Sequence, residues 1–98
     1  MNWFKRKEKI PKHEVVNKDS CLDYRLSLDV VLLAFIPTTS EKAINEDLTV
    51  LSNHLYKKHK GKKFERVFIC YYLPGMEIDA GAWATGHFDP ELEVKILE

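Results

Sequence analysis

The stretch that decides the fold is residues 37–61, which read PTTSEKAINEDLTVLSNHLYKKHKG. Thr38 followed three residues later by Glu41 matches a capping box, and Gly61 suits the end of a helix. Apolar residues recur between these signals at steps of four, three and four, which places them on one side of an α-helix. They are Ile44, Leu48, Leu51 and Leu55. The stretch therefore predicts a single amphipathic helix with one side to bury.

Upstream of this helix, residues 22–36 predict a long strand. Leu22, Tyr24, Leu26 and Leu28 alternate with polar side chains, a period of two that is typical of a half-buried strand. The following run, VVLLAFI, is apolar on both faces, as in a strand that enters the covered centre of a sheet. A short edge strand over residues 13–16 and a turn over residues 17–20 are predicted before it.

Downstream, residues 64–73 are apolar on both faces and predict a central strand. Pro74-Gly75 predicts a turn. Residues 82–88 and 92–97 then predict a hairpin connected by Asp89-Pro90-Glu91. In the predicted strand over residues 64–73, one face carries Val67, Ile69, Tyr71 and Leu73, and the other carries Phe68, Cys70 and Tyr72.

The order of elements, (β)β-α-β-β-β, indicates the α+β class. One helix with a sheet of four or five strands is stable as a two-layer sandwich, with the helix packed on an antiparallel-rich sheet. With 98 residues, 45% of them hydrophobic, the chain is sized for one domain. We predict that residues 13–98 form it and that residues 1–12 are a mobile basic tail.

The C-terminal third carries a resemblance. YYLPGM at residues 71–76 and AWATGHFDPELEVKI at residues 82–96 resemble a small group of bacterial domains without an assigned biochemical function. The likeness extends over about residues 24–97. It implies a bacterial origin and a β-α-β-β core, and it supplies no catalytic residue to transfer.

Charge, cysteine and hydropathy patterns narrow the class of protein. Fifteen basic and fifteen acidic side chains cancel, so long-range attraction to nucleic acid is not expected. The longest apolar run is too short to span a bilayer and no secretory leader is apparent, so we expect a cytoplasmic protein. Cys21 and Cys70 are expected to be reduced thiols. His54 and His59 are spaced wrongly for a shared zinc ion, and no metal or cofactor is expected.

The strand at residues 82–88 suggests a binding surface. Its one face carries only the small residues Ala82, Ala84 and Gly86, which would let a helix or a second backbone approach closely. One helix covers one face of a sheet, whereas residues 30–36 and 67–73 are apolar on both. We therefore predict a non-enzymatic protein-binding or self-assembly domain, with the uncovered face occupied by a second copy or a partner protein. The candidate surface residues are Trp83, Thr85, His87, Tyr71 and Tyr72.

Two alternatives stay open from the sequence. His87, oriented by Asp89 or Glu93, could form the centre of a small enzyme site or ligand pocket. Cys70 as a nucleophile is less favoured, because a central strand predicts a buried, inert thiol. A nucleic-acid site is suggested by a cluster of cations, although cations also suit the end of a helix. The cluster comprises Lys57, Lys58, Lys60, Lys62 and Lys63.

Overall fold

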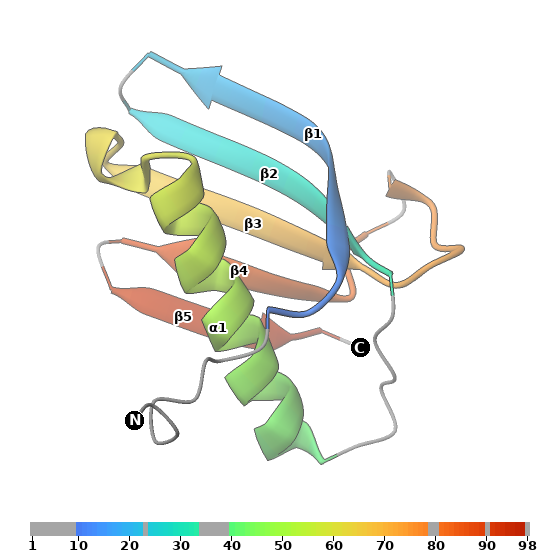
Figure 1. Ribbon diagram of the computed structural model, residues 1–98. Helices are drawn as coiled ribbons and strands as arrows, with labels where there is room; N and C mark the ends of the chain where they lie inside the picture. Colours follow the sequence, from blue (N-terminus) through green and yellow to red (C-terminus); the bar gives the residue numbers. More distant parts are fainter. Residues whose placement is uncertain (1–9, 23, 34–39, 79–80, 90, 98) are drawn as a thin grey trace, which may run out of the picture.

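The predicted α+β architecture is confirmed. A computed structural model describes residues 10–22, 24–33, 40–78, 81–89 and 91–97. One long helix packs on one face of a five-stranded sheet (Figure 1). In chain order the elements are β1 (His13–Cys21), β2 (Arg25–Leu32), α1 (Glu41–Lys58), the short 3-10 helix η2 (Gly61–Lys63), β3 (Arg66–Tyr72), β4 (Ala84–Phe88) and β5 (Leu92–Ile96).

The strands lie in the sheet in the order in which they occur along the chain, β1-β2-β3-β4-β5. Only β2 and β3 are parallel, and α1 provides the crossover between them. The other three pairs are antiparallel. The sheet is thus antiparallel-rich, with β1 and β5 at its edges.

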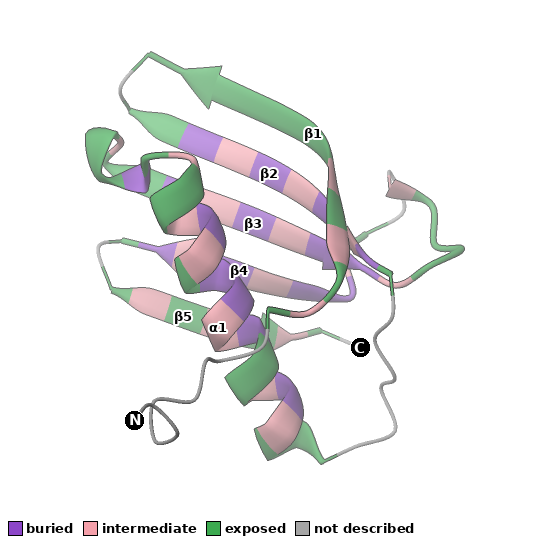
Figure 2. Ribbon diagram, viewed as in Figure 1, coloured by how far each residue is buried: buried purple, intermediate pink, exposed green. Residues whose placement is uncertain are grey.

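Period-two alternation divides the side chains of the sheet between two faces. Figure 2 shows this as alternating buried and half-buried residues along β2 and β3. The face beneath α1, which we call the covered face, meets the predicted helical stripe, whose four members are 0–6% exposed. The core residues on this face are Leu26, Leu28, Val30, Leu32, Val67, Ile69, Tyr71, Ala84 and Phe88.

The small residues of β4 allow α1 to approach the sheet closely, as predicted. A Cβ atom added at Gly86 would lie 2.6 Å from the Ser52 hydroxyl oxygen on α1. That hydroxyl shares a 2.5 Å hydrogen bond with the phenol of Tyr71, and Ser52 is fully buried. Position 86 therefore requires glycine, because the Ser52 side chain occupies the space that a Cβ atom would need. The same Ser52 hydroxyl is the hydrogen-bond partner of the buried Tyr71 phenol.

The predicted turn at residues 17–20 is wrong, because β1 continues through them to Cys21. A shift of register between Val15 and Asn17 marks a β-bulge, and it explains why the alternation did not read as one strand. The reversal comes later, where Leu22 adopts a positive φ of 51° and Tyr24 donates its N–H to the Cys21 carbonyl. Leu22 is 88% exposed and does not belong to the strand.

Both ends of α1 differ slightly from prediction. Ser40 is the N-cap, and its side chain accepts a hydrogen bond from the Ala43 N–H, so Glu41 opens the helix. Thr38, like residues 34–37 and 39, lies outside the described residues. The helix ends at Lys58, with a left-handed Lys60 at φ 54° reversing the chain. Gly61 follows this reversal and packs against the ring of Tyr56.

The connections near the C-terminus follow the predicted turn chemistry. At Pro74-Gly75 the Met76 N–H donates to the Leu73 carbonyl, and Gly75 has φ 90°, as a type II turn requires. The β4–β5 hairpin is shorter than predicted at both outer ends. Residues 1–9 of the predicted tail lie outside the described residues, while the Lys12 carbonyl accepts a hydrogen bond from the Leu33 N–H.

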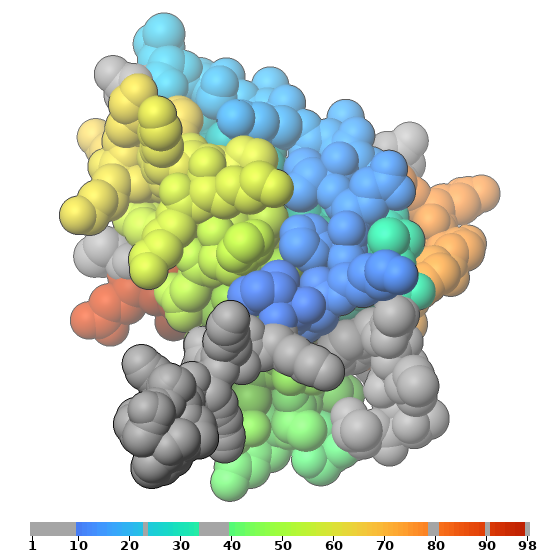
Figure 3. Space-filling view, viewed as in Figure 1, coloured from blue at the N-terminus to red at the C-terminus, as the bar shows by residue number. Residues whose placement is uncertain are grey.

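β1 forms one edge of the sheet. Its N-terminal half lies beside α1 on the molecular surface (Figure 3). Here the rings of His13 and His54 meet edge to face, with their centroids 6.0 Å apart.

Of the helices that the structure describes, none is long and apolar enough to cross a membrane.

Candidate functional site on the open face of the sheet

The face of the sheet opposite α1, which we call the open face, carries half-buried side chains from the central strands. The residues that register and alternation place on it include Ser27, Asp29 and Val31 of β2, Phe68, Cys70 and Tyr72 of β3, Thr85 and His87 of β4, and Glu93 and Lys95 of β5. Among the described elements α1 lies on the covered face only. The open face therefore presents the second side of the sheet to its surroundings.

A small pocket lies over β3, β4 and β5 on this face. It has a volume of about 190 Å³ and is lined by Phe68, Thr85, His87, Glu93 and Lys95. The rings of Phe68 and His87, opposite each other across β3 and β4, stack 4.1 Å apart at 12°. The next strand supplies Glu93 opposite His87 and Lys95 opposite Thr85. We call this set the His87 pocket.

The imidazole of His87 has an unused hydrogen-bonding atom. Its Nε2 is buried and has no hydrogen-bond partner among the described residues. A buried ring nitrogen without a partner is uncommon, because desolvating it costs free energy that a hydrogen bond would offset. The His87 pocket thus offers one ring nitrogen, one hydroxyl, one carboxylate and one ammonium group around an aromatic floor.

The carboxylates proposed to orient His87 take different positions. Asp89 is exposed and pairs with Arg66 at 3.6 Å, an interaction that solvent screens strongly. Glu93 lines the His87 pocket, yet no ion pair or hydrogen bond joins it to the imidazole in the described structure. The arrangement of a base held by a carboxylate is therefore not formed by these side chains as they stand.

Cys70 lies on the open face opposite Asp29 of β2. Burial raises the pKa of its thiol, the nearby Asp29 charge raises it further, and a hydrogen bond with Tyr72 opposes the two. A raised pKa keeps the sulfur as a thiol, which is a poor nucleophile. Cys21 is exposed at the end of β1 and is likewise free, so the two cysteines are separate thiols.

Of the five predicted surface residues, only Thr85 and His87 are half-exposed on the open face. Tyr72 is on that face but 5% exposed. Tyr71 lies on the covered face, fully buried against Ser52, so its assignment to the surface was wrong. Trp83 precedes β4 and belongs to the core, with 9% of its surface exposed, so it is not an open recognition side chain.

The lysine cluster lies away from the open face. Lys57 and Lys58 end α1, and Lys60, Lys62 and Lys63 surround η2; all five are exposed. Desolvation lowers the pKa of the neighbouring His59, and the charges of Lys18 and Lys58 lower it further. Nucleic-acid binding by this cluster stays a prediction, which a gel shift at low salt would test.

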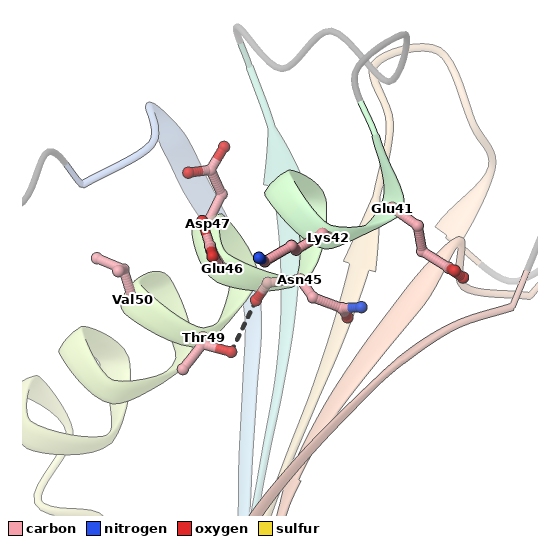
Figure 4. Close-up of a pocket in the computed structure, with 7 residues that line it drawn as sticks. All are labelled: Glu41, Lys42, Asn45, Glu46, Asp47, Thr49 and Val50. Atoms are coloured by element: carbon pink, nitrogen blue, oxygen red, sulfur yellow. Dashed lines mark hydrogen bonds between the residues drawn. The ribbon is translucent and has the colours of Figure 1, made fainter.

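A second hollow, of about 790 Å³, runs along the N-terminal half of α1 (Figure 4). Its described lining comes from that one helix, and its charged side chains spread along the helix instead of converging on a point. The Thr49 hydroxyl is used within the helix, where it donates to the Asn45 carbonyl at 2.7 Å. The residues are Glu41, Lys42, Asn45, Glu46, Asp47, Thr49 and Val50.

Metal ligation has no support in the described part of the chain, where no three His, Cys, Asp or Glu side chains gather in a group that could hold an ion.

Two residues of the His87 pocket were missed by the sequence reasoning, Phe68 and Lys95. Phe68 could have been found, because alternation along residues 64–73 already separates it from the core side. Lys95 could not be found in this way, because its place depends on the register of β5 with β4, which alternation along one strand does not determine.

Comparison with known proteins gives no relative. No protein-family model matches the sequence, and neither a curated protein nor a solved structure matches the chain significantly. The resemblance to bacterial domains therefore stays a prediction, and any functional reading depends on the geometry of the open face.

Proposed function

We propose that this is a non-enzymatic binding domain that recognises a protein through the open face of its sheet. The observation that carries the proposal is the half-buried aromatic stack of Phe68 on His87, placed at the middle of a sheet that has its only long described helix on the other side. Central strands of a two-layer sandwich are normally covered on one face only, so an aromatic group on the second face is available to a partner.

The chemistry of the open face resembles that of a protein interface. Phe68 provides apolar surface at the centre, Val31 adds apolar surface near the end of β2, and Glu93 and Lys95 provide charges of both signs on the β5 side. An apolar centre with a charged rim is the usual anatomy of a binding patch, because the centre contributes desolvation and the rim contributes specificity. The raised pKa of Cys70 and the unoriented His87 argue against nucleophilic catalysis at the same place.

A site-specific photo-crosslinker tests the proposal in the cell of origin. Placed at Thr85 it samples the open face, and placed at Asn53 it samples the exposed side of α1 as a control. We expect a discrete crosslinked product from position 85 and none from position 53. Phe68→Glu in the same chain should abolish the product, while Asn17→Asp, at the far side of the open face, should leave it. Equal crosslinking from both positions would contradict the proposal.

A small-ligand pocket is the second candidate, favoured by the buried Nε2 of His87 that has no partner in the described structure. A pocket of this size accommodates a group of a few heavy atoms. Imidazole ¹⁵N chemical shifts of His87, recorded against a panel of small carboxylates, amides and amines, would detect such a ligand. Saturable shifts of the His87 ring that Phe68→Ala, another lining residue of the pocket, weakens would support it, and shifts no larger than those of exposed histidines would exclude it.

A further inference from the structure

The edge strand β5 carries an alternating pattern that is complementary to itself. Its five residues, Leu92 to Ile96, read apolar, acidic, apolar, basic, apolar. If a second copy of β5 lies antiparallel to it with Val94 opposite Val94, then Glu93 falls opposite Lys95 and Leu92 opposite Ile96. We propose that the protein forms a symmetric dimer by pairing β5 with β5 of a second copy about Val94, which joins the two sheets into one.

Each cross-strand neighbour in this register is favourable. Opposite charges that face each other across antiparallel strands stabilise the pair, and so do apolar side chains in contact. A shift of the register by two residues would break both Glu93–Lys95 pairs, because it sets Lys95 opposite Lys95 or Glu93 opposite Glu93, and it would leave an apolar end unmatched. A two-fold axis through Val94 repeats each contact, as an isologous interface requires.

The partly exposed apolar side chains of β5 supply a second argument. Leu92, Val94 and Ile96 pack on the core from the covered face but remain half-buried, whereas Leu28 and Ile69 at the sheet centre are 0–1% exposed. A two-fold axis perpendicular to the sheet keeps the covered faces of both copies on the same side. The apolar rows of the two β5 strands would then adjoin and shield each other from water.

The opposite edge of the sheet is built differently. β1 has a bulge between Val15 and Asn17, and Glu14, Lys18 and Asp19 are exposed along it. A bulge and dense charge both oppose pairing of an edge with another strand. The register of β5 with β4 is continuous over all five residues, so its outer edge is regular. This contrast selects β5 as the edge that pairs.

The dimer would extend the His87 pocket. Glu93 and Lys95 both line that pocket, and the proposed register sets the partner's Lys95 beside Glu93 and the partner's Glu93 beside Lys95. Two copies of the pocket would then flank the dimer axis on the open face. The inference extends the proposed function by naming a second copy of the chain as one partner, but it uses an edge of the sheet, so the two proposals can fail separately.

Cysteine pairing tests the register. In a Cys21→Ser background, Val94→Cys places two thiols opposite each other at the axis, and oxidation should give a disulfide-linked dimer. Leu92→Cys is the matched control, because in the proposed register its two copies are separated by roughly 13 Å, four residues along a strand. Preferential crosslinking of Leu92→Cys, or no crosslinking of Val94→Cys at high protein concentration, would overturn the proposal.

Charge reversal tests the same contact without new chemistry. Glu93→Lys and Lys95→Glu each set like charges opposite each other twice, and we expect dimerisation, measured by light scattering across a concentration series, to weaken roughly tenfold. The double variant Glu93→Lys/Lys95→Glu restores both ion pairs and should recover the affinity. Unfolding midpoints of all three report whether the monomer stays folded.

The outcomes separate the two proposals. A wild-type protein with the mass of one chain at every concentration overturns the dimer and leaves recognition of another protein by the open face intact. A second outcome is a dimer whose affinity is unchanged by charge reversal, that forms no disulfide in Val94→Cys, and that dissociates in Phe68→Glu. This outcome overturns edge pairing and supports the open face as the self-association surface. Recovery in the double variant, with crosslinking unchanged by Phe68→Glu, supports edge pairing.

Discussion

The same strands form both faces of the sheet, but the two faces differ in how deeply their side chains are buried. On β3, the covered-face residues Val67, Ile69 and Tyr71 are 0–1% exposed, while the open-face residues Phe68 and Cys70 between them remain half-buried. The difference is not one of residue type, since both sets are largely apolar. It arises because α1 carries one stripe of apolar residues and can cover one face. Apolar patterning therefore indicates which residues are in a sheet but does not say which face is the core.

The largest expected effect contrasts two neighbours on β3. Ile69→Ala removes a fully buried side chain from beneath α1 and should lower the free energy of unfolding by about 2–5 kcal/mol. Phe68→Ala removes a half-exposed ring and should cost about 1 kcal/mol, although phenylalanine is the larger side chain. Urea unfolding of both variants would measure the difference. Equal losses of unfolding free energy in the two variants would show that Phe68 and the open face are buried in the purified protein.

Close packing of β4 under α1 gives the second prediction. Gly86→Ala directs a Cβ atom to within 2.6 Å of the Ser52 hydroxyl and should destabilise the fold by about 1–3 kcal/mol. In a Ser52→Ala background the nearest atom would be the residue-52 Cβ at 3.5 Å, an ordinary contact, so the same substitution should cost less. Thr85→Ala on the open face is the matched control, with a small expected effect. Strict additivity of Gly86→Ala and Ser52→Ala would contradict the contact.

The buried phenol of Tyr71 gives a pH dependence. Burial raises its pKa well above the ordinary value of 10.0, while the hydrogen bond with Ser52 opposes the shift. Because the unfolded chain ionises first, the stability from the neutral phenol is complete below pH 10 and is lost as the pH rises above it, by up to about 1.4 kcal/mol per pH unit.

Tyr71→Phe should lower the free energy of unfolding by about 1 kcal/mol at neutral pH, because the Ser52 hydroxyl loses its buried partner. It should also flatten the decline in stability above pH 10. Chemical unfolding of both proteins at several values between about pH 8 and pH 11, a range that spans the ordinary tyrosine pKa, would measure this pH dependence of the free energy of unfolding. An unchanged slope in the variant would assign the alkaline loss to other groups.

The smallest expected effect is kinetic and leaves stability unchanged. Cys21 is exposed, whereas the Cys70 thiol is half-buried with a raised pKa. A thiol-specific reagent at neutral pH should modify Cys21 first and Cys70 at least roughly tenfold more slowly, because the thiolate reacts. Mass spectrometry of the peptides resolves the two sites, and Cys21→Ser provides the control. Faster labelling of Cys70 would reopen a nucleophilic role for it.

Local signals in the sequence were sufficient for the type and order of the helix and strands, although not for all of their bounds. The spacing of Ile44, Leu48, Leu51 and Leu55 predicted α1 and its buried side, and Pro74-Gly75 predicted a turn of the observed type. The small residues Ala84 and Gly86 predicted close approach by a helix or a second backbone, and in the structure α1 is the element that approaches. These features succeed because propensity, periodicity and turn chemistry act over a few residues.

The same local reasoning placed β1 too short, because a bulge interrupts the period of two at Val15 to Asn17. It also assigned Tyr71 and Trp83 to the surface although both lie in the core. Tyr71 and Tyr72 are adjacent in a strand and must point to opposite faces, so only one of them could belong to the open face.

Strand order, register and the choice of the core face were decided by tertiary structure alone. The meeting of Phe68, His87 and Glu93 in one pocket requires β3, β4 and β5 to be neighbours in one particular register. No local signal specifies such contacts, because residues up to 25 positions apart gain their free energy only when the sheet has formed. The sequence by itself determined a helix, its strands and their alternation; the burial of α1 on one side decided which alternate residues became the core and which formed the candidate site.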